Sequence, residues 1–204
     1  MATTTYLKGR YAELLRNLDA GRKETAAWYR DAQQVVSGQQ IMTRNRPRLI
    51  PQRRLTTNLI GRMIMYYYEP LDKSKQSMPY FDQFPLVIPI NIYPKGWLGL
   101  NLHYISPALR VDLLDSLYSL YNDQHLDENK RLRISYRTLQ NVMRIRFFQP
   151  TVHRYGNARL RSRIYVVDPT EWDLTLLLPT ERFIGASKQR VWNDSRRKLG
   201  LGVI

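Results

Sequence analysis

Two stretches of this chain contain many arginines and no acidic residue. Residues 32–68 hold Arg44, Arg46, Arg48, Arg53, Arg54 and Arg62, and residues 129–167 hold Lys130, Arg131, Arg133, Arg137, Arg144, Arg146, Arg154, Arg159, Arg161 and Arg163. The net charge of the whole chain is +15, so the residues outside these stretches are nearly neutral. A guanidinium group pairs with phosphate through two hydrogen bonds and stacks on bases. Because crowded like charges cost free energy unless an anion offsets them, the pattern indicates a polyanionic partner.

The second stretch alternates basic and aromatic residues, among them Tyr136, Phe147 and Phe148. A basic groove with aromatic stacking platforms is typical of proteins that follow a nucleic-acid backbone without reading its sequence. The chain has no helix-turn-helix, zinc-finger or RNP motif, which would indicate base reading. The candidate DNA-binding residues are therefore Arg53, Arg54, Arg131, Arg133, Arg137, Arg144, Arg146, Arg154, Arg159, Arg161 and Arg163. The alternative is that the arginines are solvated or pair with acidic partner subunits, a role we expect for Arg44, Arg46 and Arg48.

Asp168, Glu171 and Asp173 are the best catalytic candidates in the sequence. With Arg161 and Arg163 nearby, they could hold Mg²⁺ against a phosphate, as in a nuclease. The competing interpretation is that Asp-Pro-Thr-Glu begins a helix, with Asp168 as its cap and Glu171 reaching back to it. This interpretation is favoured because no lysine accompanies the acids. We therefore predict no catalytic residue, no metal site and no cofactor, and expect the protein not to be an enzyme.

Other classes of site are excluded by residues that are absent. The chain has no cysteine, so disulfides and thiolate metal sites do not occur. It has neither a Walker-type nor a GxGxxG phosphate loop. Its three histidines lack ligand spacing, and His103 is expected to be a hydrogen-bonded structural residue. No run of eighteen apolar residues and no signal-like apolar segment is found, so we expect no membrane partner. The protein is expected to be used inside a cell or assembled there into something larger.

The elements that must position the arginines divide the chain into three parts. Residues 1–36 have helical apolar spacing and are expected to form a helical segment. Residues 37–58 hold two prolines and five arginines and few large apolar residues, which predicts a basic extended arm. Residues 59–204 are expected to form an α+β core domain.

The core is expected to contain a small curled antiparallel sheet, or a partly closed barrel, packed with helices. Strands are predicted at 59–68, 84–93 and 97–105, the last two forming a hairpin around Pro94. Pro85 and Pro89 indicate that the second strand is an edge strand or contains a bulge. Helices are predicted at 107–121, 134–143 and 187–199, a further strand at 161–167, and a helix or strand at 169–178.

Four phrases of the core carry a resemblance to a known family. They are MYYYEP at 65–70, MPYFDQFPLVIPI at 78–90, GWLGLNLHYISPALR at 96–110 and PTERFIGASKQRVWNDSR at 179–196. Together they resemble the DNA end protector proteins of the T-even type, structural proteins of tailed bacteriophages with contractile tails. The resemblance covers residues 59–196 and departs from the family pattern at Phe81 and Trp97, where tyrosine and phenylalanine are expected.

The resemblance implies a non-enzymatic virion protein, assembled in the host cytoplasm, that binds the ends of packaged double-stranded DNA. Such binding needs contacts with phosphates and no sequence code, which agrees with the arginine pattern. The alternative is a neck, tail-completion or baseplate subunit whose arginines contact neighbouring virion proteins. The basic segments are expected to converge on one face of the core in either case.

Overall fold

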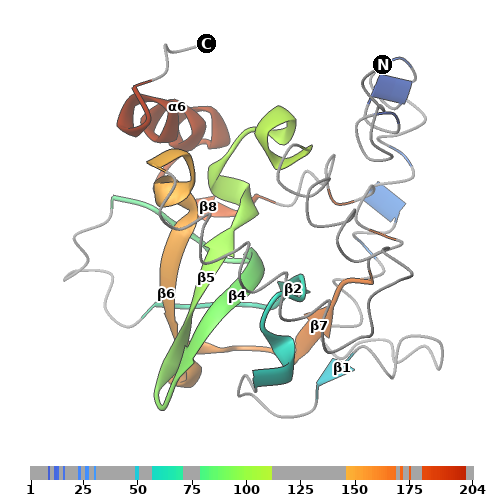
Figure 1. The fold of residues 1–204 in the computed structure, drawn as a ribbon, viewed down its shortest axis with the longest axis vertical. Helices are drawn as coiled ribbons and strands as arrows, with labels where there is room; N and C mark the ends of the chain where they lie inside the picture. The colour runs from blue at the N-terminus through green and yellow to red at the C-terminus, as the bar shows by residue number, and fades with distance from the viewer. Residues whose placement is uncertain are drawn as a thin grey trace.

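The core of the protein is a six-stranded antiparallel sheet (Figure 1). The computed structural model describes residues 57–70, 79–111, 146–168 and 181–200, with the backbone alone at 49–50 and 146–148 and isolated residues elsewhere. The strand order is β1-β7-β2-β4-β5-β6. The strands are β1 (Leu49–Ile50), β2 (Ile64–Met65), β4 (Leu86–Tyr93), β5 (Gly96–Asn101), β6 (Val152–Gly156) and β7 (Ile164–Val166). A second, two-stranded sheet pairs β3 (Phe81–Asp82) with β8 (Phe183–Ile184).

The predicted hairpin is confirmed by β4 and β5. Tyr93 pairs with Gly96, which leaves Pro94 and Lys95 as a two-residue turn. β4 lies between β2 and β5, so it is not an edge strand. The register shifts between Pro89 and Asn91, and this β-bulge accommodates the proline, which cannot donate a ladder hydrogen bond.

The predicted strand at 59–68 is shorter in the structure. A 3₁₀ turn, η2 (Thr57–Leu59), precedes it, and Gly61 has a φ of 80° while its amide donates to the Pro89 carbonyl at 2.9 Å. Beyond β2, the Tyr67 amide donates to the Ser162 hydroxyl at 2.8 Å in place of a backbone carbonyl. This side-chain contact interrupts the ladder, which resumes in the bridge between Tyr68 and Leu160.

Two further strand predictions were wrong in their bounds. The strand predicted at 97–105 ends at Asn101, whose side chain accepts from the His103 amide at 3.0 Å and starts a 3₁₀ turn, η3 (Leu102–Tyr104). The strand predicted at 161–167 is limited to β7, and β6 lies in the segment 144–160 where no strand was predicted. A short 3₁₀ helix, η4 (Arg146–Thr151), leads into β6.

The segment that follows β6 curls the sheet. After η5 (Asn157–Arg159), the chain returns beside the extension of β2, where the Arg161 amide donates to the Tyr67 carbonyl at 2.8 Å. The Gly156 amide, at the end of β6, donates to the Tyr68 hydroxyl at 3.1 Å. The sheet is therefore curled without closing into a barrel, and the predicted α+β class is confirmed.

Aromatic side chains fill the inside of the curl. The Trp97 and Tyr155 rings are stacked, with 5.4 Å between their centroids, and the Tyr66 ring meets both edge-on at 5.4 and 5.7 Å. Aliphatic residues complete this core: Leu59, Ile64, Val87, Leu160 and Ile164. Rigid rings and branched side chains of this kind hold neighbouring strands in a fixed register.

The C-terminal helix is confirmed as α6 (Lys188–Lys198), with Ser187 as its N-cap and Gly200 at a φ of 71° after its end. Pro107–Val111 are helical, as predicted for the start of helix 107–121. Most of that helix, and all of helix 134–143, lie outside the described residues. The described residues of 1–36 are helical: Gly9, Ala12, Glu13, Arg16, Lys23, Ala26, Ala27 and Arg30. Within the described part of the chain, no helix has the length and apolarity needed to cross a bilayer.

Candidate nucleic-acid interface

Arg154 is an exposed arginine on β6, at one edge of the described sheet. It pairs with Leu98 of β5, and its guanidinium lies over the ring of Tyr93 on β4, 5.3 Å from the ring centroid. A guanidinium held over an aromatic face by a cation–π contact keeps its positive charge. The sheet therefore presents an exposed, positively charged side chain that an anion can approach from solvent.

The β4–β5 turn brings more basic residues to the same end of the sheet. The Asn157 amide donates to the Lys95 carbonyl at 2.9 Å, which holds η5 against the turn. Lys95 is exposed and Arg159 is partly buried. Together with Arg154 and Arg161, these residues form what we call the hairpin-end cluster.

Arg161 is the member of this cluster with an acidic partner. Its Nε donates to the Glu69 carboxylate at 3.0 Å, and both side chains are 46% exposed. An exposed pair of this kind contributes little to stability and is screened by salt. Arg163, just before β7, is exposed and lies beyond the cluster.

The remaining predicted arginines lie outside the described residues or lack a described side chain. Arg146 is described by its backbone in η4 alone. The others are Arg44, Arg46, Arg48, Arg53, Arg54, Arg131, Arg133, Arg137 and Arg144. The expected convergence of the two arginine-rich stretches on one face therefore stays a prediction.

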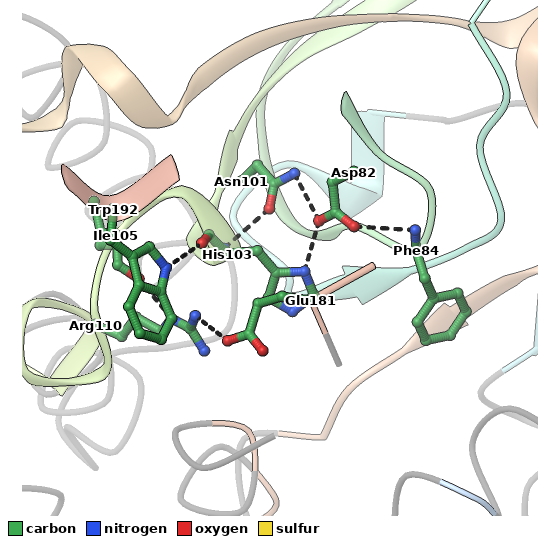
Figure 2. A network of polar contacts seen from close by, with 8 residues as sticks. All are labelled: Asp82, Phe84, Asn101, His103, Ile105, Arg110, Glu181 and Trp192. Carbon is green, nitrogen blue, oxygen red and sulfur yellow. Dashed lines mark hydrogen bonds and ion pairs between the residues drawn. The ribbon is translucent and has the colours of Figure 1, made fainter. Parts of the chain in front are cut away.

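Asp82 is a buried carboxylate, and its polar contacts are drawn in Figure 2. Its Oδ2 accepts from His103 Nδ1 at 2.6 Å and from Asn101 Nδ2 at 3.1 Å, and its Oδ1 accepts from the Phe84 amide at 3.1 Å. The side chains of Asp82 and His103 are 1% and 0% exposed. Three donors thus satisfy a buried carboxylate, and the structural role predicted for His103 is confirmed.

Glu181 is the second interior carboxylate, and it pairs with Arg110 (Figure 2). Arg110 NH2 donates to Glu181 Oε1 at 2.5 Å, while its Nε donates to the Ile105 carbonyl at 3.0 Å. Burial alone would raise the pKa of Glu181, but the charges of Arg110 and His103 outweigh it and hold this pKa below its usual value. Glu181 is therefore ionised, and its negative charge is offset by Arg110 inside the protein.

The surface is consequently more basic than the composition indicates. Among the described residues between 57 and 200, the acidic residues are buried or partly buried, and Glu69, whose side chain is 46% exposed, is paired with Arg161. The exposed basic residues in the same range are Lys95, Arg154, Arg161, Arg163, Arg182, Arg190, Arg197 and Lys198. A surface with this charge distribution attracts polyanions.

Five of these eight exposed cations are not among the candidate residues of the sequence analysis, and one of the five is Lys95 in the β4–β5 turn. Arg182, Arg190, Arg197 and Lys198 lie at or near α6, in a segment that also contains Glu181 and Asp194. The search for acid-free stretches therefore passed over them. The helix predicted at 187–199 was the signal that could have found Arg190, Arg197 and Lys198, because its polar face is mostly basic.

The catalytic alternative finds no support in the described residues. The Glu171 amide donates to the Asp168 carbonyl at 2.9 Å, as expected for the start of a helical turn. Asp173 lies outside the described residues. No group of three His, Cys, Asp or Glu among those described could hold a metal ion.

Comparisons with known proteins give one match. The family model described as "Phage T4 terminal DNA protecting protein" matches residues 19–196. The match begins well before residue 59, so it includes most of the N-terminal part, where no resemblance was noticed. Neither a curated protein nor a solved structure matches the chain.

Proposed function

Because the chain belongs to the family of phage T4 terminal DNA protecting proteins, we propose that it binds the ends of packaged double-stranded DNA through a basic, sequence-independent surface. It acts by occupying the terminus, so that an exonuclease cannot reach the last nucleotides. Such protection requires no bond to be made or broken, and the protein works without catalysis or cofactor. It is carried in the virion after assembly in the host cytoplasm.

One observation carries this proposal, namely the opposite placement of the two signs of charge. The carboxylates of Asp82 and Glu181 are buried and paired, while Arg154 and Arg163 are exposed. The resulting positive field suits phosphates, which supply most of the affinity in sequence-independent DNA binding. No base-reading motif is needed, because phosphate contacts set position and not sequence.

The proposed contacts extend the described surface into both arginine-rich stretches. The described residues among the proposed contacts include Arg154, whose guanidinium lies over the Tyr93 ring, and Arg163. Arg159 and Arg161, which lie between them in the chain, are also proposed contacts. The other proposed contacts are Arg53, Arg54, Arg131, Arg133, Arg137, Arg144 and Arg146.

The arm has a separate proposed role. β1, which lies within the predicted arm, pairs with β7 through Leu49 and Ile50, and this pairing fixes the arm to the sheet edge. We propose that Arg44, Arg46 and Arg48, just before β1, contact other virion proteins of the neck, tail or baseplate. Arms of this kind commonly become ordered on their partner.

The test compares a blunt linear duplex with a closed circle of the same sequence, using the full chain and a salt series. We expect tighter binding to the linear form, affinity that falls steeply with salt, and slower digestion of bound linear DNA by an exonuclease. Equal affinity for both forms would support duplex binding but contradict recognition of the DNA end. No binding at low salt would refute the proposal altogether.

Paired variants test the residues. Arg154→Gln with Arg163→Gln is expected to reduce the slope of log Kd against log salt by about 2, since each phosphate contact contributes about 0.9. Arg16→Gln with Arg30→Gln is the control, because it removes the same charge from exposed residues outside both arginine-rich stretches. An equal or larger effect from the control than from the pair would contradict the assignment.

A further inference from the structure

α6 carries a second basic surface, outside both arginine-rich stretches. Its sequence, KQRVWNDSRRK, has five basic residues and one acidic residue. Gln189, Arg190, Arg197 and Lys198 are exposed. Arg190 and Arg197 are seven residues apart and therefore lie on the same side of the helix, about 10 Å apart along its axis. We call this exposed set the α6 outer face.

The opposite side of α6 is fixed to the core. Val191 and Ser195 are buried, and Trp192 Nε1 donates to the His103 carbonyl at 2.8 Å (Figure 2). Arg110 and Lys188 lie over the Trp192 ring, 5.7 and 5.6 Å from its centroid. A helix anchored in this way holds its outer face in place, so little conformational entropy is lost when a partner binds.

The composition of the α6 outer face favours DNA over a protein partner. Stable protein interfaces contain a buried apolar centre, usually with aromatic anchors. The α6 outer face contributes only arginine, lysine and glutamine, and the one large apolar side chain exposed among the described residues, Ile184, lies on β8. Arginine, lysine and glutamine are residues that commonly contact phosphates in DNA complexes.

The position of α6 separates it from the hairpin-end cluster. His103, which α6 contacts, follows the end of β5, whereas Lys95 precedes the start of β5. Figure 1 accordingly shows α6 at the opposite end of β4–β5 from their turn. The six residues of β5 span about 20 Å, so a single phosphate cannot reach both basic surfaces.

We propose that the α6 outer face is a second contact surface for duplex DNA, in which Arg190, Arg197 and Lys198 bind phosphates of the backbone. This inference rests on the proposed function and adds to it a region that carries none of the proposed end contacts. Asp194, 3.7 Å from Arg197, reduces but does not cancel the charge of this face.

The test is a triple variant of the full chain, Arg190→Gln, Arg197→Gln and Lys198→Gln. Glutamine preserves helix propensity, and all three residues are exposed. By fluorescence anisotropy on a blunt duplex, we expect the log–log salt slope to fall by about 2 to 3. The matched control, Arg16→Gln, Lys23→Gln and Arg30→Gln, removes the same charge from exposed N-terminal residues and is expected to change the slope by less than about 1.

The outcomes separate the two proposals. An unchanged slope in the α6 variant, with normal binding by the wild type, overturns this inference and leaves the proposed function intact. An equal loss in the control also overturns it, because net charge would then explain the effect. Failure of the wild type to bind duplex at low salt removes both. Normal DNA binding by the variant with loss from assembled virions would assign the face to a protein partner instead.

A second measurement does not depend on lost charge. The chain has no cysteine, so Gln189→Cys creates a single labelling site on the α6 outer face. With a photoreactive maleimide attached, we expect crosslinking to the bound duplex. Absence of a crosslink while the labelled protein still binds DNA would contradict the proposal.

Discussion

Asp82 joins three parts of the core through one carboxylate. It lies on β3, and its oxygens accept from Asn101 at the end of β5, from His103 in η3 and from the Phe84 amide. The backbone carbonyl of His103 in turn accepts a hydrogen bond from the indole N–H of Trp192 on α6. The second sheet, the hairpin and α6 are thus connected through hydrogen bonds to buried groups, whose loss leaves other buried groups unsatisfied.

Asp82→Ala is therefore expected to destabilise the protein by about 3 kcal/mol, the usual cost of breaking a buried pair by removing one partner. Urea unfolding at neutral pH measures this loss. Glu69→Ala, which breaks the exposed pair with Arg161, is the control and is expected to cost less than about 1 kcal/mol. An equal loss of unfolding free energy in the two variants would show that the buried Asp82 network stabilises the protein no more than the exposed pair does.

His153 is expected to make the stability of the protein depend on pH. Burial lowers its pKa to about 4, although its bond to the Pro150 carbonyl and the charge of Asp82 act in the other direction and Lys198 adds to the lowering. Between about pH 6.5 and pH 4, the unfolded chain binds a proton at His153 that the folded protein does not. Stability should therefore fall as the pH decreases through this range, by about 2 kcal/mol from this residue.

His153→Gln removes the titrating group and isolates its contribution. Unfolding free energies at pH 7 and pH 4.5 should differ less in the variant than in the wild type, because the carboxylates titrate equally in both. A wild-type pH dependence that the variant reproduces in full would rule out this role for His153.

At the scale of elements, the hairpin and α6 could be predicted from local signals. Pro94 followed by Gly96 between two apolar runs indicates a tight turn, and Ser187 and Gly200 bracket a helical pattern. These signals depend on a few neighbouring residues and need no knowledge of the rest of the chain.

The elements that were missed depend on distant partners. β6 follows Pro150 in a segment with no clear apolar period, and it is a strand because Tyr155 pairs with Trp97. The β3–β8 pair joins Phe81 to Ile184, two residues far apart in the sequence. The hairpin-end cluster likewise exists because η5 contacts Lys95, a contact that composition and spacing do not reveal.

Gly96 is needed where β5 meets β6. A Cβ added there would lie 1.9 Å from the Tyr155 carbonyl oxygen, and a backbone atom cannot move aside cheaply. Gly96→Ala should destabilise the protein by about 3 kcal/mol, measured by thermal or urea unfolding. Gly9→Ala, where a Cβ would meet nothing within 4 Å, is the control and should be neutral or slightly stabilising.

At the scale of the whole molecule, the charge of +15 is a liability until a polyanion binds. Like charges at the surface repel one another, and added salt screens that repulsion. We therefore expect the Tm of the protein alone to rise when NaCl is increased from about 20 to about 300 mM.

Duplex DNA should reverse this salt dependence. At a concentration about 100 times its Kd, a ligand stabilises the folded state by about 2.7 kcal/mol, which is several degrees in Tm. Because salt weakens the DNA contacts, the gain in Tm from DNA should shrink as NaCl increases. Scanning fluorimetry with and without a blunt duplex measures this gain in Tm. A gain in Tm that does not depend on the NaCl concentration would contradict phosphate binding.

β7 lies between β1 and β2 in the sheet, although it comes about a hundred residues later in the chain. The Tyr67 amide and the Ser162 hydroxyl, which help to join the two regions, are 95 residues apart. During synthesis on the ribosome, β1 and β2 consequently cannot pair with β7 until most of the polypeptide has emerged. Contacts of such long range slow folding, and a chain truncated before β7 would expose the inner edges of β1 and β2 to aggregation. A nascent fragment that carries the first arginine-rich stretch therefore has no finished sheet on which to present it.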